Sequence, residues 1–333
     1  MIVAPLLVVA AQWRLVLCGD IMLNGVSPKS SPFAGIAPQL KKADLVFANL
    51  EVPMTTTGSP TKRKSPAELK ARKQFVLRAN SGHLRWLKPA GIAAVSLANN
   101  HALDYGPAAL AGELRGLDKA GIKHAGAGAT DGAARAVTVL RLENGVRVGL
   151  VSGLAFVGSG ALYKCTPATA QSAGVNALEL GGEPTAAKLA PWIRAAHERC
   201  DVLVVAFHGG IERQPFPTSY QVTLAHAAID AGADVVWGHH PHVLQGVEIY
   251  KGHPILYSMG NLVSPTPAVG GLVELAFKGS SFASCSFIPT RVSRGRVNLE
   301  SVKTRSSRMN AFSLLCEKTA SKVHGSAPAF VTD

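Results

Sequence analysis

The stretch VVWGHHPH, residues 235–242, joins a short apolar run to three histidines. The apolar part predicts a buried strand, and the histidines follow at the point where that strand would end. His240 and His242 lie two positions apart, so in an extended backbone their side chains would point the same way. Neutral imidazole is a common ligand for zinc, iron and manganese-like ions. A metal site therefore competes here with a simpler interpretation, a polar loop whose histidines form local hydrogen bonds.

Apolar runs that end in polar or ionisable residues recur along the chain. They are residues 15–18 before Asp20, 45–48 before Glu51, 93–97 before Asn99-Asn100-His101, 202–207 before His208, and 255–258 before Gly260-Asn261. Continuous apolar runs are typical of strands buried on both faces. Helical patterns lie between these runs, at residues 107–120, 185–199 and 219–231. This alternation predicts an α/β fold, in which ligands bind at the carboxyl ends of the strands.

Composition indicates a globular protein whose basic excess is compatible with anionic partners. The length of 333 residues is enough for one large domain or two smaller ones. The residues are 47% hydrophobic and 17% charged, which is typical of a globular protein. The formal net charge is +13, with part of the excess in residues 62–78 and 291–308. A basic field favours phosphates, polycarboxylates, acidic lipids or nucleic acid, although a solvated basic surface without a partner is equally compatible. No motif typical of nucleic-acid recognition is present, so we expect no nucleic-acid partner.

Further segments have their own predictions. The five cysteines are scattered, odd in number and without a Cys-X-X-Cys pair, which argues against a disulfide framework or a structural zinc site. Residues 55–75 predict a loop or lid that enters a short helix, and residues 154–184 predict a second long excursion. From Gly271 onward, alternating residues predict antiparallel strands that complete a sheet, and residues 310–322 predict a helix.

The apolar run at residues 2–11 is similar to the hydrophobic region of a signal peptide. No Lys or Arg precedes it, and it is too short to span a bilayer. A signal remnant, an early start codon and an apolar extension of the first strand are all compatible with it.

Six motifs, taken in order, resemble the capsule-synthesis protein CapA family, which is associated with poly-γ-glutamate capsules. The motifs are GDIML (19–23), NLE (49–51), ANNHALDYG (98–106), HGGIE (208–212), GHHPHVLQ (238–245) and SMGN (258–261). The resemblance covers residues 14–315, between an apolar extension or signal remnant at 1–13 and a C-terminal tail at 316–333. That family resembles the calcineurin-like metallophosphoesterases. The implied fold is α/β, a four-layer α-β-β-α sandwich with a metal site where the two central sheets present their strand ends.

The resemblance implies a role for each polar residue of the motifs. Asp20 and His242 would bind one divalent ion, and Glu51 would bridge it to a second, because one carboxylate can hold two cations. The other ligands of the second ion would be Asn100, His208 and His240. One or two divalent ions, Mn, Fe or Zn, are therefore the expected cofactors.

Three more residues are catalytic candidates by the same resemblance. His101 matches the histidine that protonates the leaving group or stabilises charge in the transition state. Asp104 would orient His101 if the turn between them is helical. Glu212 is peculiar to the capsule-type pattern, as a further ligand or as a general base.

The chain also departs from the phosphoesterase pattern. The phosphoesterases begin with Asp-X-His, whereas Met22 follows Asp20 and Ile21 here. A thioether is a poor ligand for hard divalent ions, so the first metal would lack one ligand. Glu51 replaces an aspartate, which moves its oxygens outward by one methylene, and His239 is an additional histidine.

Two functions follow from the sequence. One is a metal-dependent hydrolase of capsule or cell-envelope polymer synthesis, which acts on an anionic polymer or a phosphorylated substrate. The other is a non-catalytic component that binds a metal or a polyanion within a capsule assembly or export machine. Partners would include membrane proteins of capsule synthesis or export. A cell-envelope or membrane-associated location is favoured, and a cytoplasmic one is also compatible.

Overall fold

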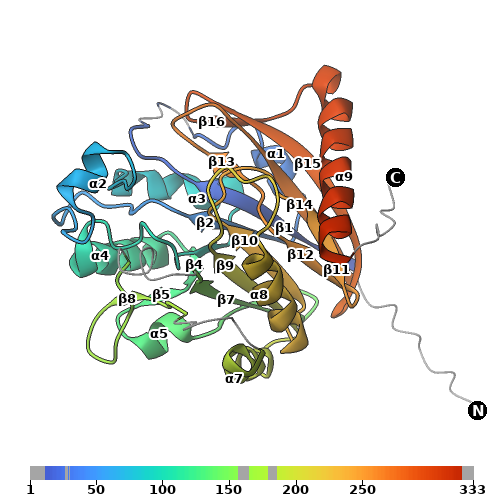
Figure 1. The fold of residues 1–333 in the computed structure, drawn as a ribbon, viewed down its shortest axis with the longest axis horizontal. Coiled ribbons are helices and arrows are strands. Elements are labelled where there is room, and N and C mark those ends of the chain that lie inside the picture. Colours follow the sequence, from blue (N-terminus) through green and yellow to red (C-terminus); the bar gives the residue numbers. More distant parts are fainter. Residues whose placement is uncertain (1–11, 27–28, 30, 157–164, 179–185, 325–333) are drawn as a thin grey trace, which may run out of the picture.

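The computed structural model describes residues 12–26, 29, 31–156, 165–178 and 186–324. The apolar run at 2–11 and Thr185, predicted as a helix cap, lie outside these residues. Two sheets lie face to face, and helices cover the outer face of each (Figure 1). The predicted α-β-β-α sandwich is confirmed.

The first sheet has eight strands. In spatial order they are β16 (Arg296–Leu299), β15 (Ser281–Ser293), β14 (Ala268–Lys278), β1 (Gln12–Ile21), β2 (Leu45–Leu50), β3 (Ala94–Ser96) and β4 (Lys123–Ala125), with β13 (Asn261–Val263) beside β1. Strands β1 to β4 and β13 are parallel, whereas β14, β15 and β16 pair antiparallel, as the alternation after Gly271 predicted.

The second sheet has six strands. In spatial order they are β11 (Val247–Tyr250), β12 (His253–Leu256), β10 (Val235–His239), β9 (Val202–His208), β7 (Arg147–Leu154) and β6 (Thr138–Arg141). The central strands are parallel, and the edge strands β6 and β11 pair antiparallel. A short ladder joins β5 (Ala127–Gly128) to β8 (Gly174–Val175).

The central strands of both sheets are buried on both faces, which explains the continuous apolar runs. In β1, Leu15 and Leu17 pack between the two sheets, while Val16 and Cys18 pack under the helices. Side chains of a strand alternate between its faces, so each run serves two cores at once. Phe47 from the first sheet and Trp237 from the second belong to the central core between the sheets.

The described helices surround the two sheets (Figure 1). They are α1 (Ala37–Leu40), α2 (Pro66–Lys70), η1 (Ser81–Trp86), α3 (Leu87–Ala90), α4 (Gly106–Lys119), α5 (Asp131–Arg135), α7 (Ala186–His197), α8 (Ser219–Asp230) and α9 (Val302–His324). Helices α1, α3 and α4 pack on the first sheet, and α7 and α8 pack on the second. Helices α4 and α8 match their predicted ranges closely. None of the described helices is both long and apolar enough to cross a membrane.

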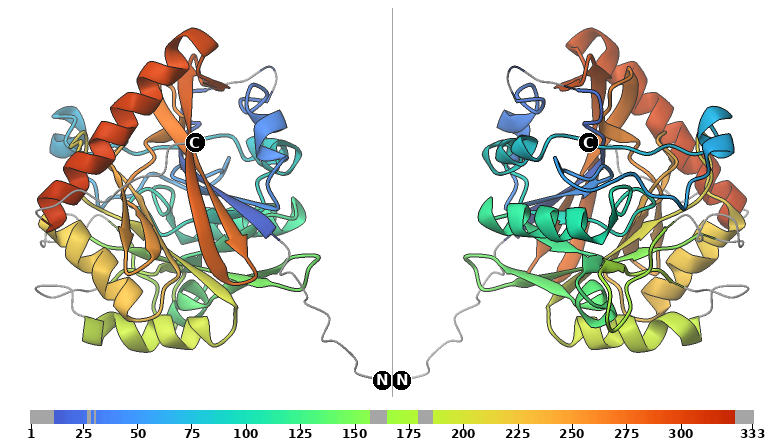
Figure 2. Two further views of the ribbon diagram at one scale, coloured as in Figure 1. Left: turned by 90° about the vertical axis from the view of Figure 1, so that its right-hand side faces the viewer. Right: turned by 90° about the vertical axis from the view of Figure 1, so that its left-hand side faces the viewer.

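Helix α9 is longer than the sequence predicted and continues through residue 316, where the tail was expected to begin. Figure 2 shows it running along the side of the C-terminal strands. Phe312 stacks on Phe287 at 3.7 Å, and the Val247 amide donates to Cys316 Sγ at 3.2 Å. The turns before Phe312 are exposed, so they lack the apolar spacing that revealed the packed part.

Candidate metal centre

The carboxyl ends of the parallel strands from both sheets meet at one place. Strand β1 carries Asp20, β2 leads into Glu51, and β9 ends in His208. Asp20 is fixed by a hydrogen bond from its amide to Gly260 O at 2.9 Å. This approach requires Gly19, since a Cβ there would lie 1.9 Å from the same oxygen. Apolar runs and backbone ladders thus bring six predicted ligands, far apart in sequence, to one point.

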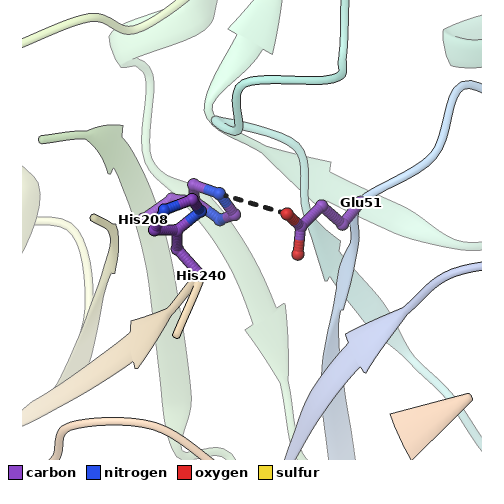
Figure 3. Close-up of side chains that lie close together, drawn as sticks. All are labelled: Glu51, His208 and His240. Atoms are coloured by element: carbon purple, nitrogen blue, oxygen red, sulfur yellow. Dashed lines mark ion pairs between the residues drawn. The ribbon is translucent and has the colours of Figure 1, made fainter. Parts of the chain in front are cut away.

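One group of donors matches the predicted second-metal set. Ligand atoms of Glu51, His208 and His240 all lie within 4.8 Å of one another. His208 Nε2 is 3.4 Å from Glu51 Oε1 and 2.9 Å from Asn100 Oδ1. In Figure 3 the two imidazoles face the Glu51 carboxylate from the opposite side of the site.

A second group matches the predicted first-metal set. Asp20, Glu51 and His242 also offer ligand atoms within 4.8 Å of one another. His242 Nδ1 lies 3.2 Å from Asp20 Oδ2, and its Nε2 lies 3.6 Å from Glu51 Oε1. Glu51 belongs to both groups, which is the position a bridging carboxylate would need. The role of each residue as a ligand stays a prediction.

Unpartnered buried atoms fit a cation at this point. Glu51 is fully buried, yet its Oε1 accepts no hydrogen bond. His240 Nδ1 is also buried without a hydrogen-bond partner. Buried polar atoms are usually satisfied, and an unsatisfied one in a native site calls for an unseen partner such as an ion. Imidazole, carboxylate and amide oxygens together suit borderline divalent metals.

Burial and mutual charge set the protonation of the cluster. Burial, followed by the charge of His242, lowers the pKa of His240 to about 3. Burial also holds the pKa of His208 well below its usual value. Burial raises the pKa of Glu51 well above its usual value. Burial would also raise the pKa of Asp20, but hydrogen bonds and charge from His239 and His242 outweigh it, so the pKa of Asp20 lies well below its usual value. The neutral imidazoles of His208 and His240 keep the lone pairs through which histidine binds metal.

The pKa of His242 shifts in the opposite direction to those of His208 and His240. Burial alone would lower it, but the neighbouring Glu51 and Asp20 carboxylates raise it to about 10. A divalent ion held by Asp20, Glu51 and His242 would take the place of the His242 proton, because a ligand imidazole must be neutral.

The backbone of the histidine motif is not extended, contrary to the prediction. Strand β10 ends at His239, and the φ angles of His240 and His242 are 98° and 57°. Left-handed backbone at a non-glycine residue is unfavourable and is typical of functional sites. The two rings still converge, with centroids 5.8 Å apart, because the turn rather than the strand pleat directs them.

Three residues with no predicted role support the donors. Asn49 Nδ2 donates to Asp20 Oδ1 at 2.9 Å, and His239 Nδ1 is 2.9 Å from the same oxygen. Asn261 Oδ1 lies 3.0 Å from His242 Nδ1. Their positions at or next to strand ends were the only sequence signal, and it does not separate ligands from supporting residues.

His101 and Asp104 are in contact, as the predicted turn requires. His101 Nδ1 lies 2.7 Å from Asp104 Oδ2, and the Asp104 amide donates to His101 O at 2.9 Å. Burial, followed by the charge of Lys64, lowers the pKa of His101 to about 4. His101 is therefore neutral at pH 7.

Lys64 is the residue that the sequence most clearly misassigned. Its place in the basic segment at residues 62–78 predicted an exposed charge, either solvated or facing an anionic partner, but its side chain is fully buried. Its Nζ forms an ion pair with Asp104, lies 3.2 Å from His101 Nδ1, and donates to Phe75 O at 2.7 Å. It thus ties the predicted lid segment to the turn that carries His101.

A cleft of about 720 Å³ opens beside the donors. His101, Glu212 and His242 line it, so all three catalytic candidates lie at it or directly behind it. Glu212 also forms a donor group with His240 and His242, and the next amide, of Arg213, donates to Pro241 O at 2.8 Å. This bond fixes the Glu212 loop beside the histidine turn.

Comparison with known proteins establishes the family. A model described as bacterial capsule synthesis protein PGA_cap matches residues 14–266. The chain belongs to this family. It is 32% identical over 253 residues to the PGA biosynthesis protein CapA of Bacillus subtilis, covering 74% of this chain and 61% of that protein. It is 29% identical over 268 residues to the capsule biosynthesis protein CapA of Bacillus anthracis, covering 79% and 62%. The PGA_cap chain thus spans about three-fifths of the length of these relatives.

Solved structures agree on the fold. A structure described as a novel phosphatase from Mycoplasma pneumoniae has a TM-score of 0.53 at 15% identity, covering 85% of this chain and 94% of that one. A hypothetical protein from Thermus thermophilus has the same TM-score at 17% identity, covering 84% and 99%. The PGA_cap chain therefore shares its fold with these two proteins, one of which is described as a phosphatase.

Met22 marks the departure of this PGA_cap chain from the phosphoesterase pattern. It is partly buried and lines the cleft. A thioether is a poor ligand for hard ions, so Met22 would not replace the imidazole that the resemblance led us to expect beside Asp20.

Proposed function

We propose that this chain is a metal-dependent hydrolase of bacterial capsule polymer metabolism, which cleaves a phosphoester or amide bond in an anionic substrate. The observation that carries the proposal is the fully buried Glu51, shared by two donor groups and left with an oxygen that accepts no hydrogen bond. The substrate class is supported by the family and by the excess of basic residues. This chain covers only 61% and 62% of the two CapA relatives. Its role in capsule synthesis is therefore part of this proposal and is not carried over from them.

The donor groups would hold the cofactor without rearrangement of the fold. Asn100, His208 and His240 with Glu51 would hold one divalent ion, and Asp20, His242 and Glu51 a second. Divalent ions bound there would supply Lewis-acid polarisation of the scissile group and lower the pKa of water.

His101 would handle the proton of the leaving group. Its Nδ1 faces the Asp104 carboxylate, an acceptor, and the Lys64 ammonium, a donor. The neutral ring can therefore carry its proton on Nδ1 or on Nε2, and Nε2 is the nitrogen left for substrate. Transfer of the Nε2 proton to the leaving group would be matched by transfer of a proton from the Lys64 ammonium to Nδ1, since the neutral ring would otherwise become an imidazolate.

Metal content is the first test. Elemental mass spectrometry of purified protein would compare wild type with Glu51→Ala and His240→Ala, and with His197→Ala on α7 as a control that removes an imidazole outside the cluster. We expect near-stoichiometric Mn, Fe or Zn in wild type and control and a loss in both site variants. Metal-loaded protein would then be assayed on a chromogenic phosphodiester and on γ-glutamyl oligomers. Absence of bound metal after incubation with each ion would refute the proposal.

One observation favours a second function, a non-catalytic component that binds a metal or a polyanion. Met22 leaves the Asp20–Glu51–His242 group without the imidazole of the phosphoesterase pattern. Protein that holds metal and binds polyglutamate but hydrolyses neither substrate class would favour this function over the first.

A further inference from the structure

A second hollow adjoins the cleft beside the metal centre. Its volume is about 380 Å³, and Pro265 lines both it and the cleft. The two also share a second border, because Asn24 lines the cleft and the next residue, Gly25, lines the hollow. The cleft and the hollow are therefore neighbouring parts of one surface depression.

The hollow is strongly basic. Lys29, Arg294 and Arg296 line it, and its other described lining residues carry no charge. Within the described part of the chain, none of these three cations forms a salt bridge. Three cations with no acidic partner raise the local positive potential, which attracts an anionic group.

The local backbone holds the two arginines beside the cleft. Arg294 and Gly295 form the turn between β15 and β16, with φ angles of 51° and 69°. Such a turn prefers Asn or Gly at its first position, so an arginine there is not chosen for backbone conformation. A Cβ on Gly295 would lie 2.5 Å from Val26 Cγ1, so the turn is pressed against the segment that borders the cleft.

We infer that this hollow, the Arg294–Arg296 hollow, is a distal anion subsite for an extended substrate whose reacting group lies at the metal centre. Its ligand is a second carboxylate or phosphate of the same molecule. A single small anion fills neither space, since volumes of roughly 300–1,000 Å³ accommodate ligands of drug size. The inference rests on the proposed function for the position of the reacting group. It adds that recognition of the substrate depends on the length of the substrate as well as on the bond that reacts.

Binding of oligomers of different length tests the subsite. Titration calorimetry on the metal-loaded full chain would measure Kd for γ-glutamyl oligomers of two and eight residues. A parallel arm would use pyrophosphate and an eight-unit polyphosphate, which separates carboxylate from phosphate recognition. The test variant is Arg294→Gln/Arg296→Gln. The control is Arg194→Gln/Arg199→Gln, which removes the same charge from exposed positions on and just after α7.

We expect the long oligomer to bind more tightly than the short one in wild type. The test variant should weaken the long oligomer about tenfold, the effect of losing two exposed cation contacts, and leave the short one unchanged. The weakening should shrink at high salt, because exposed charges are screened. Equal affinity of test variant and wild type for the long oligomer, an equal loss in the control, or no binding of any oligomer would overturn the inference.

The same experiment separates this inference from the proposed function. Length-dependent binding that requires Arg294 and Arg296, in protein that hydrolyses nothing, would leave the subsite standing and refute the hydrolase. The opposite result would be hydrolysis that is lost in His240→Ala but unchanged in Arg294→Gln/Arg296→Gln, for long and short oligomers alike. That result would support the hydrolase and refute the subsite.

Discussion

Replacing Lys64 by methionine breaks the buried ion pair behind His101. The Lys64 ammonium contacts Asp104, His101 Nδ1 at 3.2 Å, and the carbonyls of Phe75 at 2.7 Å and Asn100 at 3.2 Å. Methionine keeps the length of the side chain but removes the charge and every donor. The Asp104 carboxylate, 1% exposed, then has no buried counter-charge. Removal of one partner of a buried pair costs about 3–5 kcal/mol, so we expect a loss of this size in the free energy of unfolding.

A matched control lies two residues away. Lys62→Met makes the same chemical change at an exposed position and should shift the unfolding free energy by no more than about 0.5 kcal/mol. Urea unfolding followed by tryptophan fluorescence would measure both variants. A double-mutant cycle with Asp104→Asn isolates the pair: the double variant should lose about 1–3 kcal/mol less than the sum of the single losses.

The functional consequence is separable from stability. Lys64 contacts His101 but none of the donor atoms of the two metal groups. At a temperature where Lys64→Met is still folded, turnover should therefore fall while metal content is unchanged. A Lys64→Met protein as stable as Lys62→Met, or a strictly additive cycle, would refute the buried-pair reasoning.

Three further predictions concern pH, metal and the missing ligand. Burial raises the pKa of Glu113 on α4 to about 8, so the folded protein keeps a proton that the unfolded chain loses near pH 4.5; stability should fall as pH rises from about 5 to 8. Glu113→Gln should remove this fall, which is worth about 3 kcal/mol at pH 7. Urea titrations at several pH values would measure the unfolding free energy of both proteins, and a difference between them that stays constant with pH would contradict the prediction. EDTA should lower the calorimetric Tm of wild type but not of His240→Ala, since a bound ion stabilises only the state that binds it; equal shifts would place the metal elsewhere. Met22→His should increase the metal retained after dialysis, and unchanged stoichiometry would mean that the Asp20–Glu51–His242 group does not need that ligand.

The sequence predicted the α/β class and the gathering of polar strand ends for a physical reason. A strand buried on both faces must be apolar throughout, so its end is visible where Asp20, Glu51 or His208 interrupts the run. Parallel strands bring those ends together whatever their separation along the chain. The four layers and the role of each residue at the site were implied by the family resemblance and not by this pattern.

Features that depend on single tertiary contacts were not predictable. Lys64 lies in a run of lysines and arginines, and nothing local distinguishes the one that is buried against Asp104, forty positions away. The left-handed backbone of His240 and His242 was not predictable either, since histidine adopts it more often than most residues but still only rarely. The Arg294–Arg296 hollow likewise exists only because the β15–β16 turn packs against Val26.

The residues behind the metal centre discriminate between the two functions better than the donors do. Metal-binding donors are required whether the chain hydrolyses a substrate or only binds a metal. The solved structures that share the fold are only 15% and 17% identical, so they show the architecture and not the function. Lys64 and Asp104 bind no predicted ion, yet they are buried against His101 at the cost of desolvating two charges. A protein that only binds a metal does not require a neutral imidazole fixed beside its donors, although the same contacts also hold the segment that carries Phe75. A hydrolase does require one, because the group that protonates the leaving group must be held in place before the substrate arrives.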